Sequence, residues 1–315
     1  MSGTSKVVIG TRGSELALWQ SRWVEKQLLK LQPSLRIEIR TIKTKGDKIL
    51  DSALSKIGDK GLFTKEIEHA LLDGSVDIAV HSLKDIPTKV EEGLTISAIC
   101  EREDVRDVFV AHGNKNYSTL ADIPHGGTIA TGSLRRRCQL LRIRPDLTIV
   151  EIRGNLGTRI EKLNASDWDG MLLAKAGITR LGRTELIAEI LSPAQILPAV
   201  GQGALAIETR ESDADVRALI KPLDHLPTRQ AVLGERALLR RLEGGCQVPI
   251  GAYARIENDK YKMDAMIGSL DGKRSVRSSI EGRPNDAEKL GLELAEQLLS
   301  AGGEAILNEI RELNV

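Results

Sequence analysis

Residues 6–31 read KVVIGTRGSELALWQSRWVEKQLLKL, and this stretch sets the pattern for the first half of the chain. Its first part, Lys6–Gly10, is the short apolar run of a buried strand. The part that follows, Ser14–Leu31, places large apolar side chains at near-helical spacing and predicts a helix with Ser14 as its N-cap. Thr11-Arg12-Gly13 then forms a strand-to-helix turn. A strand followed by a helix is the unit from which α/β folds are built.

The same alternation of strands and helices continues to about residue 174. Leu35–Thr41 alternates apolar and charged residues and predicts a strand, whereas Leu62–Asp73 predicts a helix that ends at Gly74. The segment Thr44–Gly61 is rich in Lys, Gly and Asp and predicts a functional or mobile loop. Further strands are expected at Val76–Val80, Leu94–Ile99, Asp107–Ala111, Thr128–Thr131, Leu147–Ile152 and Gly170–Ala174, with helices that begin at Ser133 and Leu156.

The remainder of the chain has a different pattern. Gly201–Thr209 is expected to cross back to the first α/β unit, and a helix is expected at Thr228–Leu242. Strands at Gly251–Ile256, Lys260–Ile267 and Ser275–Ile280, with helices at Asp286–Leu299 and Glu304–Leu313, predict a small α+β domain. The predicted fold class is therefore α/β, with two α/β lobes, a ligand cleft between them and a small α+β C-terminal domain.

Composition restricts the function classes. A chain of 315 residues with 41% hydrophobic and 28% charged residues is typical of a soluble protein of about two or three domains. Only 3% of residues are aromatic and the net charge is +1, which argues against a nucleic-acid or membrane-surface partner. We expect a cytoplasmic protein, since no signal-peptide pattern or long apolar stretch is present. Cys100, Cys138 and Cys246 have neither disulfide-framework nor zinc-site spacing, so no metal is expected.

Arginine recurs at three predicted strand-to-helix turns, in the groups Arg12; Arg135, Arg136 and Arg137; Arg153 and Arg159. A helix N-terminus offers unpaired backbone N–H groups, and a guanidinium adds a planar fork of donors for carboxylates or phosphates. Because the helix dipole disfavours a cation there, the repetition indicates a bound anion. Each cluster alone fits a solvated surface equally well, and the pattern indicates a polyanion without specifying which one.

Two further positions are candidates for chemistry. Lys84 and Asp85 follow a buried strand, where Asp85 is either a turn former or a carboxylate that faces a ligand cation. Cys246 follows Gly244-Gly245, so its thiol can project from a glycine-rich loop into a cleft, where cations would lower its pKa below about 8.5. The alternative for Cys246 is a small buried apolar side chain, and Cys138 fits that description on a helix.

Seven motifs together resemble the porphobilinogen deaminase family, in the order in which that family carries them. They are Thr11–Gln20, Lys60–Phe63, Val80–Pro87, Gly132–Arg136, Arg153–Asn155, Pro198–Ala204 and Gly244–Cys246. The resemblance implies two lobes similar to periplasmic binding proteins and a C-terminal domain that carries the cysteine. The implied domains are 1–103 with 204–222, 104–203, and 223–315.

The resemblance also implies an activity and residue roles. Members are monomeric transferases that condense four porphobilinogen units into linear hydroxymethylbilane, with release of ammonia, in haem and porphyrin biosynthesis. A dipyrromethane cofactor would be attached through a thioether to Cys246, and Asp85 would be the catalytic carboxylate at the pyrrole nitrogens. The expected cofactor ligands are Lys84, Ser133, Arg135 and Arg136, and the expected substrate ligands are Arg12, Ser14, Arg153, Arg159 and Arg180. The loop near Lys56–Lys60 would act as a lid.

Three positions depart from the family pattern: Gly132, Gly157 and Lys175. Two other interpretations of the residues stay open. One is a two-lobed receptor for a polycarboxylate without chemistry, and the other is an enzyme that handles phosphates, although no P-loop is present.

Overall fold

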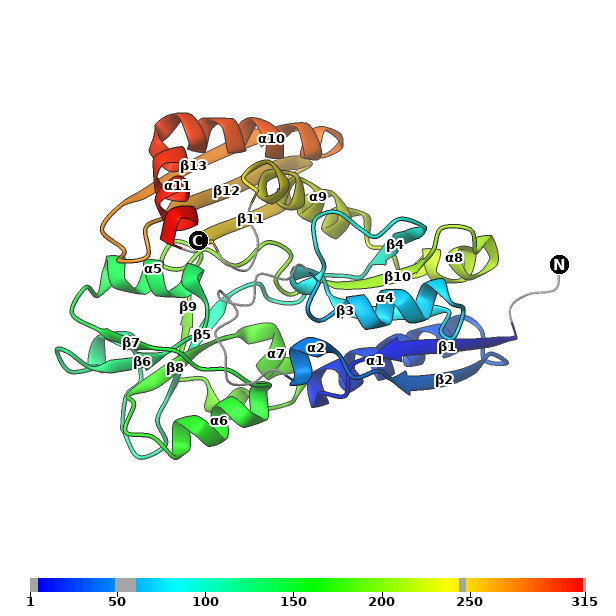
Figure 1. The fold of residues 1–315 in the computed structure, drawn as a ribbon, viewed down its shortest axis with the longest axis horizontal. Helices are drawn as coiled ribbons and strands as arrows, with labels where there is room; N and C mark the ends of the chain where they lie inside the picture. The colour runs from blue at the N-terminus through cyan, green and yellow to red at the C-terminus, as the bar shows by residue number, and fades with distance from the viewer. Residues whose placement is uncertain (1–4, 49–60, 244–247, 314–315) are drawn as a thin grey trace. The chain divides into compact units, whose positions relative to one another are not determined.

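The computed structural model describes residues 5–48, 61–243 and 248–313, which divide into two compact units (Figure 1). Of these residues, 5–48, 61–103 and 203–229 form the first unit. The second unit holds 104–202, 230–243 and 248–313. The expected three-domain boundaries stay a prediction. No helix within the described ranges is long and apolar enough to cross a membrane.

The first unit is built on a five-stranded sheet with the order β2-β1-β3-β10-β4. Strand β1 runs parallel to β2 and β3, whereas β10 runs antiparallel to β3 and β4. The strands are β1 (Lys6–Thr11), β2 (Arg36–Thr41), β3 (Ile78–Ser82), β4 (Leu94–Ile99) and β10 (Leu205–Arg210). Because β10 comes from beyond the second lobe in sequence, the predicted return of the chain to the first unit is confirmed.

Helices cover this sheet and place the turns at its edge. They are α1 (Glu15–Leu31), α2 (Lys45–Lys48), α4 (Lys65–Leu72), the 3-10 turn η1 (Leu83–Asp85), α8 (Ala214–Ile220) and the 3-10 turn η4 (Lys221–Leu223). Helix α1 buries Val24 and Leu28 against the strands, and Ser14 is its N-cap as predicted. The cores of the described chain are mostly aliphatic, as the low aromatic content predicts.

Several predicted bounds in this unit differ from the structure, and one short helix was not predicted. Helix α4 begins at Lys65 rather than Leu62, because the chain first makes a turn at Gly61, whose φ is +84°. Strand β3 begins at Ile78 rather than Val76, because the Asp77 carboxylate accepts the Val8 backbone N–H at 2.8 Å and the Val76 carbonyl accepts from Arg210 at 2.7 Å. The short helix α2 lies inside the segment that was predicted to be a loop, of which residues 49–60 lie outside the described ranges.

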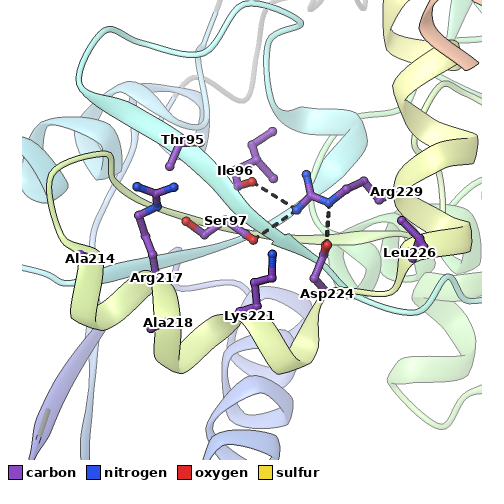
Figure 2. A pocket seen from close by; sticks show the side chains of 10 residues that line it. All are labelled: Thr95, Ile96, Ser97, Ala214, Arg217, Ala218, Lys221, Asp224, Leu226 and Arg229. Carbon is purple, nitrogen blue, oxygen red and sulfur yellow. Dashed lines mark hydrogen bonds and ion pairs between the residues drawn. The ribbon is translucent and has the colours of Figure 1, made fainter. Parts of the chain in front are cut away.

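Strand β4 is an edge strand, and two side chains bond part of its exposed backbone; Figure 2 shows the bonds made by Arg229. Asp224 accepts the Ile99 N–H at 2.8 Å, and Arg229 donates to the Ser97 carbonyl at 3.2 Å. Arg229 also pairs with Asp224 at 2.7 Å. These contacts protect a sheet edge that would otherwise present unpaired backbone groups.

The second unit contains a sheet with the same arrangement, in the order β7-β6-β8-β5-β9. Strand β6 is parallel to β7 and β8, and β5 is antiparallel to β8 and β9. The strands are β5 (Asp107–Ala111), β6 (Thr128–Ala130), β7 (Thr148–Val150), β8 (Gly170–Ala174) and β9 (Glu189–Leu191). The helices are α5 (Leu134–Ile143), α6 (Leu156–Asn164) and α7 (Lys175–Arg180). Two 3-10 turns, η2 (Leu120–Asp122) and η3 (Thr184–Leu186), belong to the same unit. Strand β9 was not predicted, because three residues are too few to show a period of two.

The C-terminal part is the predicted α+β arrangement. Its sheet is antiparallel, in the order β11-β12-β13. The elements are α9 (Leu226–Arg241), β11 (Ile250–Glu257), β12 (Lys260–Gly268), β13 (Ser275–Gly282), the 3-10 turn η5 (Pro284–Asp286), α10 (Ala287–Leu298), the π-helical turn η6 (Leu299–Gly303) and α11 (Glu304–Leu313). Helices α9 and α10 approach closely at two glycines, since a Cβ atom on Gly291 would lie 2.1 Å from the Gly234 carbonyl oxygen. The fold class predicted from the sequence is confirmed.

Candidate active site

Asp85 ends the short turn η1, directly after strand β3. Its carboxylate is half-buried, and within residues 5–48, 61–243 and 248–313 no hydrogen bond or ion pair is formed to it. The turn itself is anchored, because the Leu83 N–H donates to the Ala204 carbonyl at 3.0 Å. The neighbouring Lys84 is exposed. A half-buried carboxylate without a protein partner is suited to face a cationic group on a ligand.

Arg12 lies in the turn between β1 and α1, where it is already paired. Its guanidinium binds both oxygens of Asp47, with Nε 3.1 Å from Oδ1, and stacks 4.2 Å from the Phe63 ring centre. Burial raises the pKa of the Asp47 carboxyl, but Arg12 and Thr44 outweigh that effect and hold the pKa below its usual range. Arg12 is therefore held in a fixed orientation by the protein itself.

Arg135 and Arg136 lie in the first turn of α5 and share one buried carboxylate. Arg135 donates to Asp107 at 2.7 Å and Arg136 donates to its other oxygen at 2.8 Å. Asp107 is fully buried, and the two arginines are 5% and 6% exposed. Burial alone would raise the pKa of Asp107, yet the two guanidinium groups lower it well below the usual range.

This arginine pair keeps one net positive charge after Asp107 is counted. Both guanidinium groups also donate to backbone carbonyls, Arg135 to that of Leu197 at 2.6 Å and Arg136 to that of Leu172 at 3.0 Å. The Nε atoms of both arginines are buried and have no hydrogen-bond partner among the described residues. An uncompensated buried cation is costly, so the pair is suited to receive an anionic ligand.

The remaining predicted arginines lie around α6 and α7. Arg153 is 9% exposed and precedes α6, while Arg159 donates from Nε to the Gly154 carbonyl at 2.9 Å. Gly154 has a φ of +117°, which a residue with a side chain would adopt only with strain. Arg180 is 9% exposed at the end of α7. Arg153 and Arg159 thus flank one turn, as the sequence predicts.

Ser14 and Ser133 are helix N-caps. The Ser14 hydroxyl accepts the Ala17 N–H at 3.3 Å, and the Ser133 hydroxyl accepts the Arg136 N–H at 3.4 Å. Because a hydroxyl also carries a donor hydrogen, each serine can cap its helix and still donate to a carboxylate. Their capping role is observed, whereas their role toward a ligand stays a prediction.

Two of the three cysteines, Cys100 and Cys138, lie within the described residues. Cys100 and Cys138 are buried, and burial raises the pKa of the Cys138 thiol to about 12. The expectation that Cys138 occupies an ordinary helix position is confirmed, because it lies in α5. Cys246 and the predicted lid residues near Lys56–Lys60 lie outside the described residues.

A hollow of about 640 Å³ beside strand β4 is a separate feature (Figure 2). None of the predicted site residues lines it. Arg217 and Lys221 reach it from α8 and η4, and both are exposed. Arg229 is bound to Asp224 there, as described above.

Sequence reasoning missed the carboxylates that hold the arginines. Three arginine turns were taken to indicate a bound anion, but part of the compensation comes from Asp47 and Asp107 within the protein. The signal for Asp107 was present, because a charged residue opens the apolar strand Asp107–Ala111 and a carboxylate buried there must be paired. Asp47 carried no comparable signal inside a polar segment. Lys175, one of the three positions that depart from the family pattern, also has an internal partner. Its Nζ lies 2.9 Å from Asp104 Oδ2.

Comparison with known proteins covers most of the chain. Residues 7–218 match the family described as "Porphobilinogen deaminase, dipyromethane cofactor binding domain", and residues 229–300 match "Porphobilinogen deaminase, C-terminal domain". The chain is 53% identical to porphobilinogen deaminase of Chloroherpeton thalassium, over 98% of each chain. It is 51% identical to porphobilinogen deaminase of Carboxydothermus hydrogenoformans, over 97% of each chain. Among solved structures it is similar to the methionine-binding protein MetQ, with 13% identity and a TM-score of 0.42 over 72% of this chain and 91% of that chain.

Proposed function

The chain belongs to the porphobilinogen deaminase family, and we propose from that premise that it joins four porphobilinogen molecules head to tail into linear hydroxymethylbilane. Each condensation releases one ammonia, and one water molecule supplies the hydroxyl group of the released product. The protein is thus a transferase of porphyrin, tetrapyrrole and haem biosynthesis, a hydroxymethylbilane synthase. The observation that carries this proposal is about 50% identity to porphobilinogen deaminases over nearly the whole chain.

The residues described above fit the dipyrromethane cofactor of this family. Dipyrromethane carries acetate and propionate groups, so its site must supply cations. The Arg135–Arg136 pair has a net positive charge and two buried Nε donors without acceptors among the described residues, which suits a carboxylate. We assign Lys84 and Ser133 to the binding of the same cofactor, and Cys246 to the thioether that attaches it. When bound, dipyrromethane supplies the free pyrrole carbon to which the first substrate ring is joined.

Asp85 is the proposed catalytic residue. Loss of ammonia from porphobilinogen places positive charge on the pyrrole nitrogen, and a carboxylate beside that nitrogen lowers the energy of the charged state. A carboxyl group in that position can also deliver a proton to the departing amine. The lack of a partner for Asp85 within the described part of the chain supports this role, since no ion pair there already engages its charge.

The incoming substrate brings one acetate and one propionate. We assign their binding to Arg12, Ser14, Arg153, Arg159 and Arg180. Because one charge-assisted hydrogen bond contributes only about 1.5–3 kcal/mol, several donors are needed to hold a growing polyanion. Fixing Arg12 through Asp47 before binding reduces the entropy that the complex must lose.

Intact-protein mass spectrometry, together with a pyrrole-sensitive colour reaction, tests the proposal. Purified wild-type protein should carry a two-ring adduct, and Cys246→Ala should fold but carry none. Cys138→Ala is the matched control and should keep the adduct, because Cys138 is buried in α5. An adduct that persists in Cys246→Ala would refute the attachment. A wild-type protein with neither adduct nor condensation would instead favour a two-lobed polycarboxylate receptor.

We further propose that the protein is monomeric and cytoplasmic, with porphobilinogen as its small-molecule partner and no nucleic-acid partner. The net charge of +1 supports the absence of a nucleic-acid partner. Sedimentation of the purified protein should give the mass of a single chain at every concentration. A mass that rises with concentration would contradict the monomer.

A further inference from the structure

A continuous set of buried hydrogen bonds leads away from the arginine pair within the second unit. The Gln202 side chain donates from Nε2 to Asp107 Oδ1 at 2.9 Å and to the Val105 carbonyl at 2.7 Å. Gln202 is 1% exposed and Asp107 is fully buried. Asp107 therefore receives hydrogen bonds from three side chains, of which two are the arginines.

The adjacent residue carries the connection into the C-terminal part. The Gly201 N–H donates to Glu235 Oε2 at 2.7 Å, and the Ala254 N–H donates to Glu235 Oε1 at 2.7 Å. Glu235 is fully buried on helix α9, and Ala254 lies on β11. One buried carboxylate thus joins the 198–204 segment, α9 and the C-terminal sheet.

A second set of contacts fixes the same segment to α5. The Leu197 carbonyl accepts from Arg135 at 2.6 Å and from Gln139 at 3.0 Å, and the Leu197 N–H donates to Gln139 at 2.8 Å. The Pro198 carbonyl accepts the Ala252 N–H at 3.0 Å. The chain from Leu197 to Gln202 is therefore bonded to α5 on one side and to the C-terminal part on the other.

We propose that Asp107, Gln202 and Glu235 are positioning residues, which hold the Arg135–Arg136 pair in a fixed place relative to helix α9. In the sequence, helix α9 comes directly before the glycine-rich segment that contains Cys246. This inference rests on the proposed function. It gives a role to the Pro198–Ala204 motif, which the resemblance singles out without one.

The physical reason for such a network is the precision that anion binding requires. A displacement of about 1 Å of a binding group can cost a factor of about a hundred in rate. A buried polar network is stable only when its members are bonded, so it has few alternative arrangements. Arginines on a surface would instead sample many side-chain conformations.

The test replaces Gln202 with Met, which has similar length but donates no hydrogen bond. We expect the kcat per mole of adduct-bearing protein to fall about tenfold, with the KM for porphobilinogen within about twofold of wild type. Glu235→Gln keeps the size of the side chain but loses one hydrogen-bond acceptor. It should also lower kcat per mole of adduct-bearing protein. It serves as the second variant if Gln202→Met does not fold.

Asp169→Asn is the matched control for a purely structural effect. Asp169 is a buried carboxylate of the same unit, bonded to Lys115 at 2.6 Å and to the Thr128 N–H at 2.7 Å, outside the network. Its replacement should lower the Tm but leave kcat per adduct-bearing molecule unchanged. If Gln202→Met and Glu235→Gln both have a lower Tm but keep the wild-type kcat per adduct-bearing molecule, the positioning role is wrong. If wild-type protein itself has no adduct and no activity, the proposed function fails instead.

Discussion

The two α/β lobes have the same sheet arrangement but differ in how their charged side chains are paired. In both sheets the first three strands of the order are parallel, the fourth is antiparallel to them, and the fifth is antiparallel to the fourth. In the first lobe, Arg12 is matched by Asp47, and the Asp85 carboxylate is left without a partner among the described residues. In the second lobe, two arginines share the single carboxylate of Asp107.

The comparison shows how one scaffold can supply two functions. An unpaired carboxylate suits a cation that develops during a reaction, whereas a surplus of buried guanidinium groups suits permanent anions. We therefore expect changes in the first lobe at Asp85 to affect the chemical step. Changes at the arginine pair of the second lobe should mainly reduce the retention of the polyanion, with a smaller decrease in kcat per adduct-bearing chain than changes at Asp85 cause.

Asp85→Asn should have the largest effect. The amide has nearly the same shape but no negative charge, so the cation at the pyrrole nitrogen loses its partner and kcat should fall by a factor of about 100 to 1,000. A coupled colour assay of hydroxymethylbilane formation measures this. A kcat within twofold of wild type would remove Asp85 from its proposed role.

Arg136→Gln should have the next largest effect. It removes the net positive charge of the pair, because Arg135 and Asp107 then neutralise each other. The loss of one charge-assisted contact corresponds to a factor of about ten to a hundred in anion affinity. Intact mass should show a reduced fraction of adduct-bearing chains, and full occupancy would contradict the assignment.

Arg12→Gln should raise the KM for porphobilinogen about tenfold with a smaller change in kcat, since the proposed contact is with a substrate carboxylate. Asp47→Asn is the matched variant, because it frees Arg12 without removing it. A KM unchanged in both variants would show that this pair serves the fold alone.

The pH dependence of stability should also differ between the lobes. The pKa of Asp107 lies below that of an unfolded Asp, which is about 3.9, so its pairing stabilises the fold above that pH and is lost as the pH falls toward the folded pKa. Asp107→Asn should therefore flatten the decrease of Tm as the pH falls below about 5. Asp47→Asn should flatten it less, because Asp47 is more exposed. Equal slopes in all three proteins would contradict this.

The cysteines of the two lobes should behave alike, and this is the smallest expected effect. Cys100 is 1% exposed and Cys138 is 2% exposed. Neither should react with a thiol reagent at pH 8 until the protein is denatured, as peptide mapping of the alkylated protein would show. Rapid labelling of Cys138 in the native protein would contradict its burial.

The sequence predicts elements well where the apolar period is clear and poorly where tertiary contacts decide. Leu94–Ile99 and Gly170–Ala174 were predicted to the residue, because both are short runs with clear boundaries. The start of β3 was missed, since side-chain bonds from Asp77 and Arg210 replace ladder bonds there. For the candidate site, arginine turns and Asp85 were visible in the sequence. The carboxylates Asp47 and Asp107 were not recognised: Asp47 lies in a polar segment that gives no local pattern, whereas the charged residue that opens strand Asp107–Ala111 was a signal that was not used.

The most direct test of this division of roles measures two quantities in the same samples. Asp85→Asn and Arg136→Gln are purified in parallel, and each is assayed for the fraction of chains that carry the two-ring adduct and for kcat per adduct-bearing chain. We expect opposite results: Asp85→Asn should keep the adduct and lose kcat, whereas Arg136→Gln should lose adduct and keep more of its kcat per remaining adduct. If both variants lose the same quantity to the same degree, the two lobes do not divide the roles as proposed.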